Sequence, residues 1–123
     1  MEQLQSLVGK TFDNVAIPGY MENNYFHPAP FALWILTFDG PTIRLDWGQA
    51  DIQYSEVSTI SYEFDVDDVG CSFADVFAIE LGDIEDVEIA ENNAELKIRT
   101  NKGVFAVDAW NLEGFHYYFV PCE

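Results

Sequence analysis

Residues 31–47 read FALWILTFDGPTIRLDW, and this stretch predicts a β-hairpin. Its first half, Phe31 to Phe38, is an apolar run after Pro30 that is typical of a strand covered on both faces. Its second half, Thr42 to Trp47, alternates polar and apolar side chains with the two-residue period of a half-buried strand. Because Asp39-Gly40-Pro41 is a turn sequence, the two strands are expected to pair antiparallel.

Strand patterns recur along the rest of the chain, whereas helical patterns are short. Leu4, Leu7 and Val8 have helical spacing, so a short opening helix ending at Gly9 is expected. Ser72 followed by Asp75 resembles a capping box that begins a second helix through Leu81, although an extended pattern fits the same residues. Further strands are expected over residues 11–17, 57–66, 86–90, 94–100, 104–110 and 115–120, with an ordered loop over 20–30.

Two parts of the chain, about residues 4–50 and 76–113, have related spacing that indicates an internal duplication of a strand-hairpin unit. The matched residues include Thr37, Gly40 and Trp47 in the first part and Thr100, Gly103 and Trp110 in the second. Chance agreement among common strand and turn residues is the alternative explanation. We therefore predict a single domain that is mainly β, with one or two short helices. Its two related hairpin units would form an antiparallel curved sheet, a sandwich or a partial barrel.

The charge of the chain limits its partners. Its 123 residues include 22 acids but only five Lys and Arg, which gives a formal net charge of -17 at pH 7. Such a protein repels nucleic acid and anionic membranes and attracts cationic molecules. Direct binding of nucleic acid or of a membrane is therefore not expected. The N-terminus also lacks the basic and apolar regions of a signal peptide, so a cytoplasmic location is expected.

The acids are concentrated between Glu63 and Glu91, where the sequence has no Lys or Arg. Apolar residues recur through this segment and can anchor it to a core, so a folded acidic surface is expected rather than a disordered tail. The carboxylates predicted to contact a basic partner are Glu63, Asp65, Asp67, Asp68, Asp75, Asp83, Glu85 and Asp86. Tyr62 and Phe64 lie among them, and Tyr20 and Tyr25 are further candidate aromatic anchors.

Catalytic and metal-binding patterns are weak. Cys71 and the two imidazoles, His27 and His116, have no local signature of a Cys-His pair, and nearby acids would raise the pKa of a thiol. A calcium-loop pattern beginning at Asp65 fails because Val69 and Val76 occupy ligand positions. No enzymatic activity, cofactor or metal is therefore predicted. Cys71 and Cys122 are expected to remain reduced thiols, and the three tryptophans are expected to pack in the core.

The acid-rich middle and the two hairpins give the chain a general character that resembles the immunity proteins of bacterial polymorphic and contact-dependent growth-inhibition toxin systems. No diagnostic motif carries the resemblance. It implies binding and neutralisation of one cognate basic toxin, often a nuclease, inside the cell that makes both proteins. Two other functions remain open: a DNA mimic that inhibits nucleic-acid-binding proteins, and a non-enzymatic β domain with a structural or ligand-binding role. The oligomeric state is not predicted.

Overall fold

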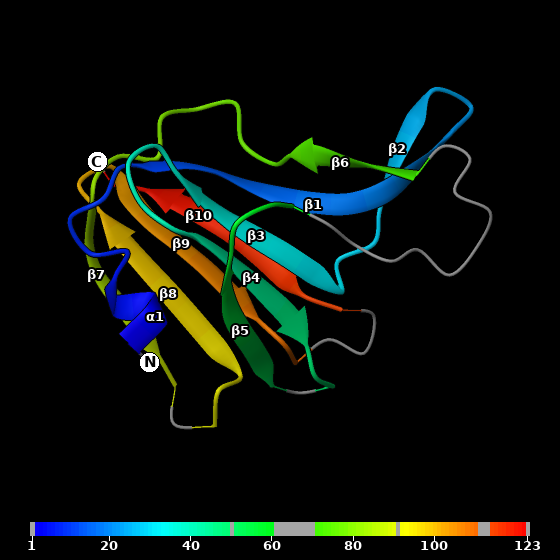
Figure 1. Ribbon diagram of the computed structural model, residues 1–123. Coiled ribbons are helices and arrows are strands. Elements are labelled where there is room, and N and C mark those ends of the chain that lie inside the picture. The colour runs from blue at the N-terminus through cyan, green and yellow to red at the C-terminus, as the bar shows by residue number, and fades with distance from the viewer. Residues whose placement is uncertain (1, 50, 61–70, 91, 111–113, 123) are drawn as a thin grey trace.

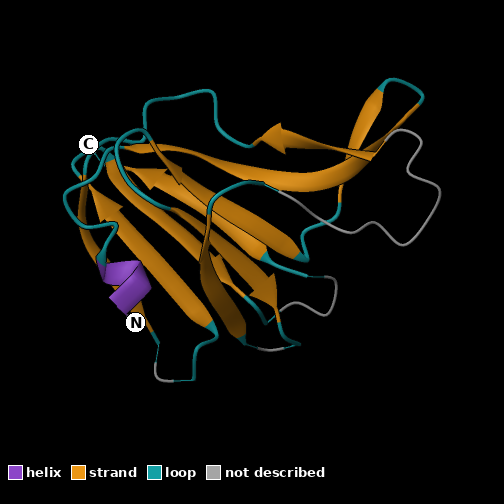
Figure 2. Cartoon of the chain, in the orientation of Figure 1, coloured by secondary structure: helices purple, strands orange, loops and turns teal. Residues whose placement is uncertain are grey.

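The computed structural model describes residues 2–49, 51–60, 71–90, 92–110 and 114–122. Within these ranges the chain forms one short helix and ten β-strands, arranged in two antiparallel sheets (Figures 1 and 2). The mainly β prediction is confirmed. The two sheets share one buried core and do not close into a barrel, which agrees with the expected sandwich.

The first sheet contains six strands in the N-terminal part of the chain. After helix α1 (Glu2–Gln5), they are β1 (Phe12–Glu22), β2 (Tyr25–Pro28), β3 (Ala32–Thr37), β4 (Thr42–Trp47), β5 (Ile52–Val57) and β6 (Cys71–Asp75). The order is β2-β1-β3-β4-β5, and β6 also pairs with β1. Because Gly19 and Tyr20 pair with both β2 and β6, these two strands lie on opposite edges of β1.

The second sheet is a four-stranded meander. Its strands are β7 (Ile84–Ile89), β8 (Glu95–Thr100), β9 (Gly103–Asp108) and β10 (His116–Pro121), in the order β10-β9-β8-β7. Alternate residues of both sheets meet in one buried core, whose central members are Leu33, Ile35, Ile43, Leu45, Leu96, Ile98, Phe105 and Val107. Each such side chain contributes about 1.5–3 kcal/mol by leaving water, so this shared core holds the two sheets together.

The two sheets have matching register. In the first, a bulge lies between Phe12 and Asn14 of β1 opposite β3, and in the second, a bulge lies between Ile84 and Asp86 of β7 opposite β8. Hydrogen bonds between the sheets also match, because Ile52 N donates to Asn93 O and Phe115 N donates to Pro30 O, each at 2.6 Å.

A duplicated unit would produce this matching register, although the ancestry of the two halves stays a prediction. The structure changes two details of the expected match. Trp47 N donates to Phe31 O and Ala109 N donates to Ala94 O, so the register matches Trp47 with Ala109 rather than with Trp110. The matched strands also extend to β5 and β10, beyond the expected limits of both units.

The helix expected from Ser72 to Leu81 is wrong, because residues 71–75 form β6 and residues 76–81 are not helical. β1 offers a free edge that pairs with the whole of β6, from Ala16 to Tyr20. The Asn14 side chain then binds the backbone of Phe77 twice, donating to its O at 2.8 Å and accepting from its N at 3.0 Å. These long-range hydrogen bonds outweigh the local capping pattern.

The ordered loop expected over residues 20–30 is also wrong. β1 continues through Pro18-Gly19 to Glu22 and pairs with β2, forming a hairpin that we call the arm, residues 19–28. Its turn is Asn23-Asn24, with φ angles of 55° and 69°. Asparagine tolerates this left-handed conformation, which a two-residue hairpin turn with right-handed twist requires.

The remaining elements agree with the predictions from the sequence to different degrees. The opening helix is confirmed, and the turns after it end at Gly9, where φ is 88°. The strands expected at residues 11–17, 31–38, 42–47, 86–90, 94–100, 104–110 and 115–120 all form, with shifted ends. The strand expected over 57–66 does not match, because β5 ends at Val57 and residues 58–60 are not in a strand. Residues 61–66 lie outside the described part of the chain.

Candidate functional site

The predicted acidic site lies partly outside the described residues. This holds for Tyr62, Glu63, Phe64, Asp65, Asp67 and Asp68. The other four predicted carboxylates do not lie on one surface. Asp75 is exposed on β6, at an edge of the first sheet, whereas Asp83, Glu85 and Asp86 lie at the beginning of β7 in the second sheet.

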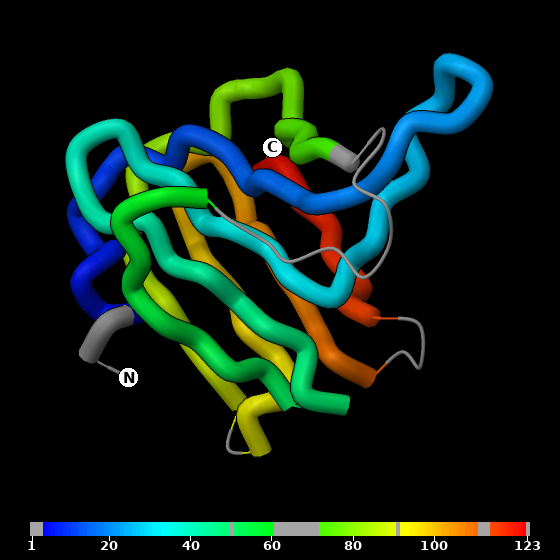
Figure 3. Tube along the Cα trace, turned by 45° about the vertical axis from the view of Figure 1, so that its right-hand side comes forward, coloured from blue at the N-terminus to red at the C-terminus, as the bar shows by residue number. Residues whose placement is uncertain are grey.

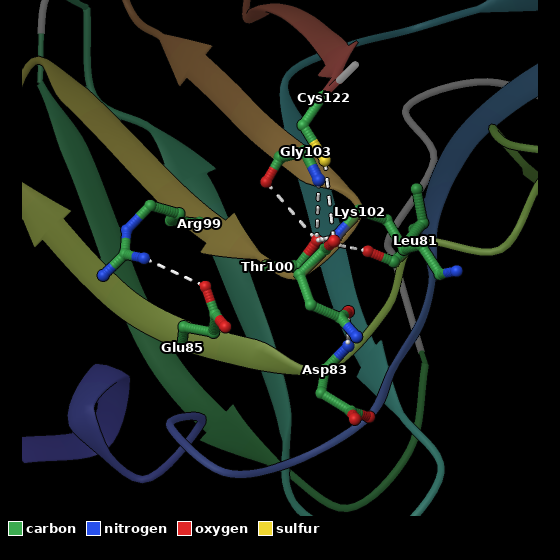
Figure 4. Close-up of polar contacts among 9 residues, drawn as sticks. Leu81, Asp83, Glu85, Arg99, Thr100, Lys102, Gly103 and Cys122 are labelled. Carbon is green, nitrogen blue, oxygen red and sulfur yellow. Dashed lines mark hydrogen bonds and ion pairs between the residues drawn. The ribbon is translucent and has the colours of Figure 1, made fainter.

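Two of the three carboxylates near β7, those of Asp83 and Glu85, have partners within the chain. Thr11 Oγ1 donates a hydrogen bond to Asp83 Oδ1 at 2.9 Å, and the main chains of the same two residues form a β-bridge. Arg99 Nη1 forms an ion pair with Glu85 Oε1 at 2.9 Å (Figure 4). Asp86 lies opposite Arg99 in the register of β7 and β8. This group is therefore partly neutralised, which the sequence segment from 63 to 91 alone did not indicate.

The acids of the chain greatly exceed the cations that can neutralise them. The two arginines are already engaged, Arg44 with Asp46 at 3.0 Å and Arg99 with Glu85. Only three lysines remain for the other carboxylates, so the net charge of -17 must be balanced by solvent ions or by another molecule. The predicted excess of unneutralised acid thus holds for the protein as a whole, even though Glu85 is paired.

The arm presents exposed aromatic side chains. It projects beyond the body of the sandwich (Figures 1 and 3). Tyr20 is 45% exposed, Met21 is 47% exposed and Tyr25 is 72% exposed. The ring of Tyr20 stacks on His27 with 4.9 Å between centroids and 14° between planes. Phe26 packs instead against the main core and anchors the arm. Tyr20 and Tyr25, the candidate anchors outside the acidic segment, therefore lie on one well-defined hairpin.

A second small cluster lies on the outer face of the first sheet. Trp34 is fully buried there with Ala16 and Ala32, and its ring meets the edge of Phe73 at 5.2 Å between centroids. The Arg44 guanidinium lies 5.5 Å from the Trp34 ring centroid. The expected burial of Trp34 is confirmed, but it packs outside the main core.

Of the other two tryptophans, Trp47 packs against the main core as expected, whereas Trp110 does not. Trp47 is half-buried, and its Nε1 donates to Ala109 O at 3.3 Å. Trp110 is 55% exposed, so its predicted core position is wrong. Its Nε1 donates to Glu95 Oε1 at 3.1 Å across the outer face of the second sheet. That hydrogen bond satisfies the indole at the surface, where one side of the ring stays in contact with water.

A pocket of about 560 Å³ opens where the beginnings of β1 and β7 meet. Its wall includes the apolar side chains of Phe38 and Ile79, the carboxylates of Asp13 and Glu80, and Lys102. The described lining contains no histidine or cysteine. This mixture suits binding of a polar group better than nucleophilic chemistry.

The candidate bases His27 and His116 lie on different sheets, and the side chain of the candidate nucleophile Cys71 lies outside the described part of the structure. His27 stacks on Tyr20 of the arm, and His116 Nδ1 lies 3.2 Å from Asp108 Oδ2 on the other sheet. Cys122 is an exposed free thiol whose Sγ lies 3.5 Å from Asn101 O. Burial raises the pKa of the Tyr117 phenol on β10 above its ordinary value, because desolvation disfavours the phenolate.

The described residues contain neither a metal-binding cluster nor a membrane-spanning helix. No group of three or more His, Cys, Asp and Glu side chains there is arranged to hold a metal ion. No helix in the same residues has the length and apolar character needed to cross a membrane. Comparison of the chain with protein-family models, with curated proteins and with solved structures finds no match.

Proposed function

We propose that this protein is an immunity protein that binds and neutralises a basic protein toxin, of which a nuclease is the leading candidate. The observation that carries the proposal is the excess of 22 acids over five cations on a folded β scaffold whose two arginines are already paired. A negative surface steers a basic partner toward it and pairs with the cations of a cleft built for a polyanion. A non-enzymatic role in the cytoplasm, where such a toxin acts, belongs to the same proposal.

The exposed aromatics of the arm support the proposal. Protein interfaces typically bury about 800 Å² per partner and depend on a few aromatic and arginine side chains beside the charges. Tyr20 and Tyr25 have the exposure that such anchors need before binding. The predicted acidic residues Glu63, Asp65, Asp67 and Asp68 supply the charge in this proposal.

Affinity capture from the native cell, followed by mass spectrometry, tests the proposal. One basic protein should be recovered at stoichiometric level, and the purified chain should inhibit its activity at a 1:1 ratio. Recovery of no basic partner would overturn the proposal. Recovery of several unrelated DNA-binding proteins, each displaced by DNA, would replace it with the DNA-mimic function.

Charge variants then test how the partner is recognised. Replacing Glu63, Asp65, Asp67 and Asp68 with their amides should slow association and flatten its salt dependence, because electrostatic steering depends on the negative charge that the protein presents to a basic partner. Glu85→Gln is the matched control, since Arg99 already pairs with this carboxylate. Equal effects of the two sets on the association rate would place the contact surface elsewhere.

A further inference from the structure

The first sheet contains an internal example of how this protein holds a guanidinium. Arg44 lies over the ring of Trp34, and its Nε donates to both carboxylate oxygens of Asp46, at 3.0 and 3.1 Å. An aromatic face and a carboxylate on the same side of a sheet therefore bind the two parts of the group, its flat π surface and its N–H edge.

The outer face of the arm contains the same two components. Tyr20 lies opposite His27, and Glu22 lies opposite Tyr25, in the register of β1 and β2. Directly opposite residues share a face of an antiparallel pair, as do residues two apart on one strand, so all four side chains lie on one side of the arm. On β1 this is the side of Ala16, which belongs to the Trp34 cluster.

The strands of the arm contain no Lys or Arg. The sequence contains no Lys or Arg from Thr11 to Ile43, which spans the whole arm. Tyr25, at 72% exposure, and the stacked pair of Tyr20 and His27 thus offer aromatic surface to solvent beside the carboxylate of Glu22. The arm has the aromatic and acidic components found around Arg44 but lacks the arginine.

We infer that the outer face of the arm binds an arginine side chain of the basic partner. The inference rests on the proposed function and names the chemistry that the partner brings to the arm. Arginine suits the site better than lysine because its planar guanidinium stacks on aromatic faces, is more weakly hydrated, and carries five donors. A second copy of this chain does not suit it, since each copy carries a charge of -17 and both of its arginines are paired.

Calorimetric titration with two peptide probes, nona-arginine and nona-lysine, tests the inference on the purified full chain. Both peptides carry the same charge and share the general attraction to the acidic protein, so the ratio of their affinities isolates the guanidinium. An aromatic contact at an exposed site is worth about 0.5–1 kcal/mol, which corresponds to a preference for nona-arginine of about two- to fivefold.

Substitutions in the arm test whether the preference for nona-arginine arises from its aromatic side chains. Tyr20→Leu and Tyr25→Leu together should abolish the preference for nona-arginine, whereas Glu22→Gln should weaken binding of both peptides. Tyr118→Leu is the matched control, because Tyr118 is 44% exposed on β10 of the other sheet and should leave the preference unchanged. Circular dichroism and urea unfolding confirm that each variant is folded before it is titrated.

Two results would overturn the inference: equal affinities of the native chain for the two peptides, or a preference that survives the double tyrosine substitution. Failure of this inference can be distinguished from failure of the proposed function. If the peptide preference maps to the arm but no toxin is captured, the arginine site stands and the immunity role does not. If the double variant neutralises a toxin as well as the native chain does, and the peptide preference is absent, the immunity role stands and the arginine site does not.

Discussion

The third residue of β3 is Trp34, and the third residue of β8 is Lys97. The two positions are equivalent in the matching registers of the two sheets, yet Trp34 is fully buried and Lys97 is exposed. Both sheets use alternate residues to build the shared core. The first sheet also buries the large side chain of Trp34 on its outer face, together with Ala16 and Ala32, whereas the outer face of the second sheet buries the small Ala106 opposite Lys97.

This difference follows from what is added to β1. Among the described strands, β7 pairs with β8, whereas β1 pairs with β3 and also with β2 and β6. The additions provide Phe73 against Trp34 and create the projecting arm. On the outer face of the second sheet, charged residues pair with one another, as Glu85 does with Arg99. The exposed aromatic side chains of the arm therefore lie on the sheet that has the added strands.

The largest expected effect concerns the equivalent positions 34 and 97. Trp34→Ala should lower the free energy of unfolding by about 3–5 kcal/mol, because it empties a packed site beneath Phe73 and Arg44. Lys97→Ala should change it by less than about 0.5 kcal/mol, because Lys97 is exposed. Urea unfolding followed by fluorescence of the remaining tryptophans measures both. Similar losses for the two variants would show that the outer faces are not energetically different.

A smaller difference is expected at the last residues of β3 and β8, which are both threonines. Thr100 is buried, and its Oγ1 accepts hydrogen bonds from Lys102 N at 3.0 Å and Gly103 N at 3.2 Å (Figure 4). It also donates to Leu81 O. Thr37 is only half-buried, and its Oγ1 donates to Pro41 O at 3.1 Å.

Thr100→Val should therefore destabilise the protein by about 1–3 kcal/mol, because two backbone donors lose their acceptor. Thr37→Val should cost about 1 kcal/mol or less, because water can replace its single hydrogen bond. Thr100→Ser, which keeps the hydroxyl, should retain most of the stability. Thermal unfolding of the three variants tests the order, and a Thr37 effect as large as that of Thr100 would contradict it.

The smallest difference is expected between the two arginines. Arg44→Gln should cost about 1 kcal/mol, since it removes both the ion pair with Asp46 and the contact with Trp34. Arg99→Gln should cost less than about 0.5 kcal/mol, because its side chain is 56% exposed and its pair with Glu85 is solvated. Urea midpoints at low and high salt compare the two. A larger loss of stability in Arg99→Gln than in Arg44→Gln would show that the Arg99 ion pair stabilises the protein more than the Arg44 contacts do.

Local patterns predicted the elements whose pairing partner follows closely in the sequence. The Phe31 to Trp47 hairpin formed as expected because its turn and its strands are contiguous. Asn23-Asn24 suits the two-residue turn of the arm, but Pro and Gly at positions 18 and 19 are residues that usually end a strand, so the local pattern favours a loop over 20–30. Pro18 is tolerated within β1 because its missing N–H costs nothing where no ladder partner needs it, and its O accepts from Ala29 N at 2.8 Å.

Other features depended on distant partners. The sequence of residues 72–75 is compatible with a helix or a strand. These residues form a strand because they pair with the free edge of β1. The neutralisation of Glu85 required Arg99, which a window limited to residues 63–91 excludes. Trp110 alternates in sequence like a core residue but lies beyond the end of β9, so it reaches the surface and Glu95 instead.

The sequence by itself determined the strand periodicity, most of the hairpins, the mainly β class and the large negative charge. These properties depend on residue type and on neighbours a few positions away, which a one-dimensional pattern contains. The tertiary structure alone decided that the first sheet buries side chains on both faces, that β6 is a strand, and that the arm projects with its aromatic side chains exposed. Each of these depends on hydrogen bonds and contacts between distant parts of the chain, whose free energy outweighs the small local preferences.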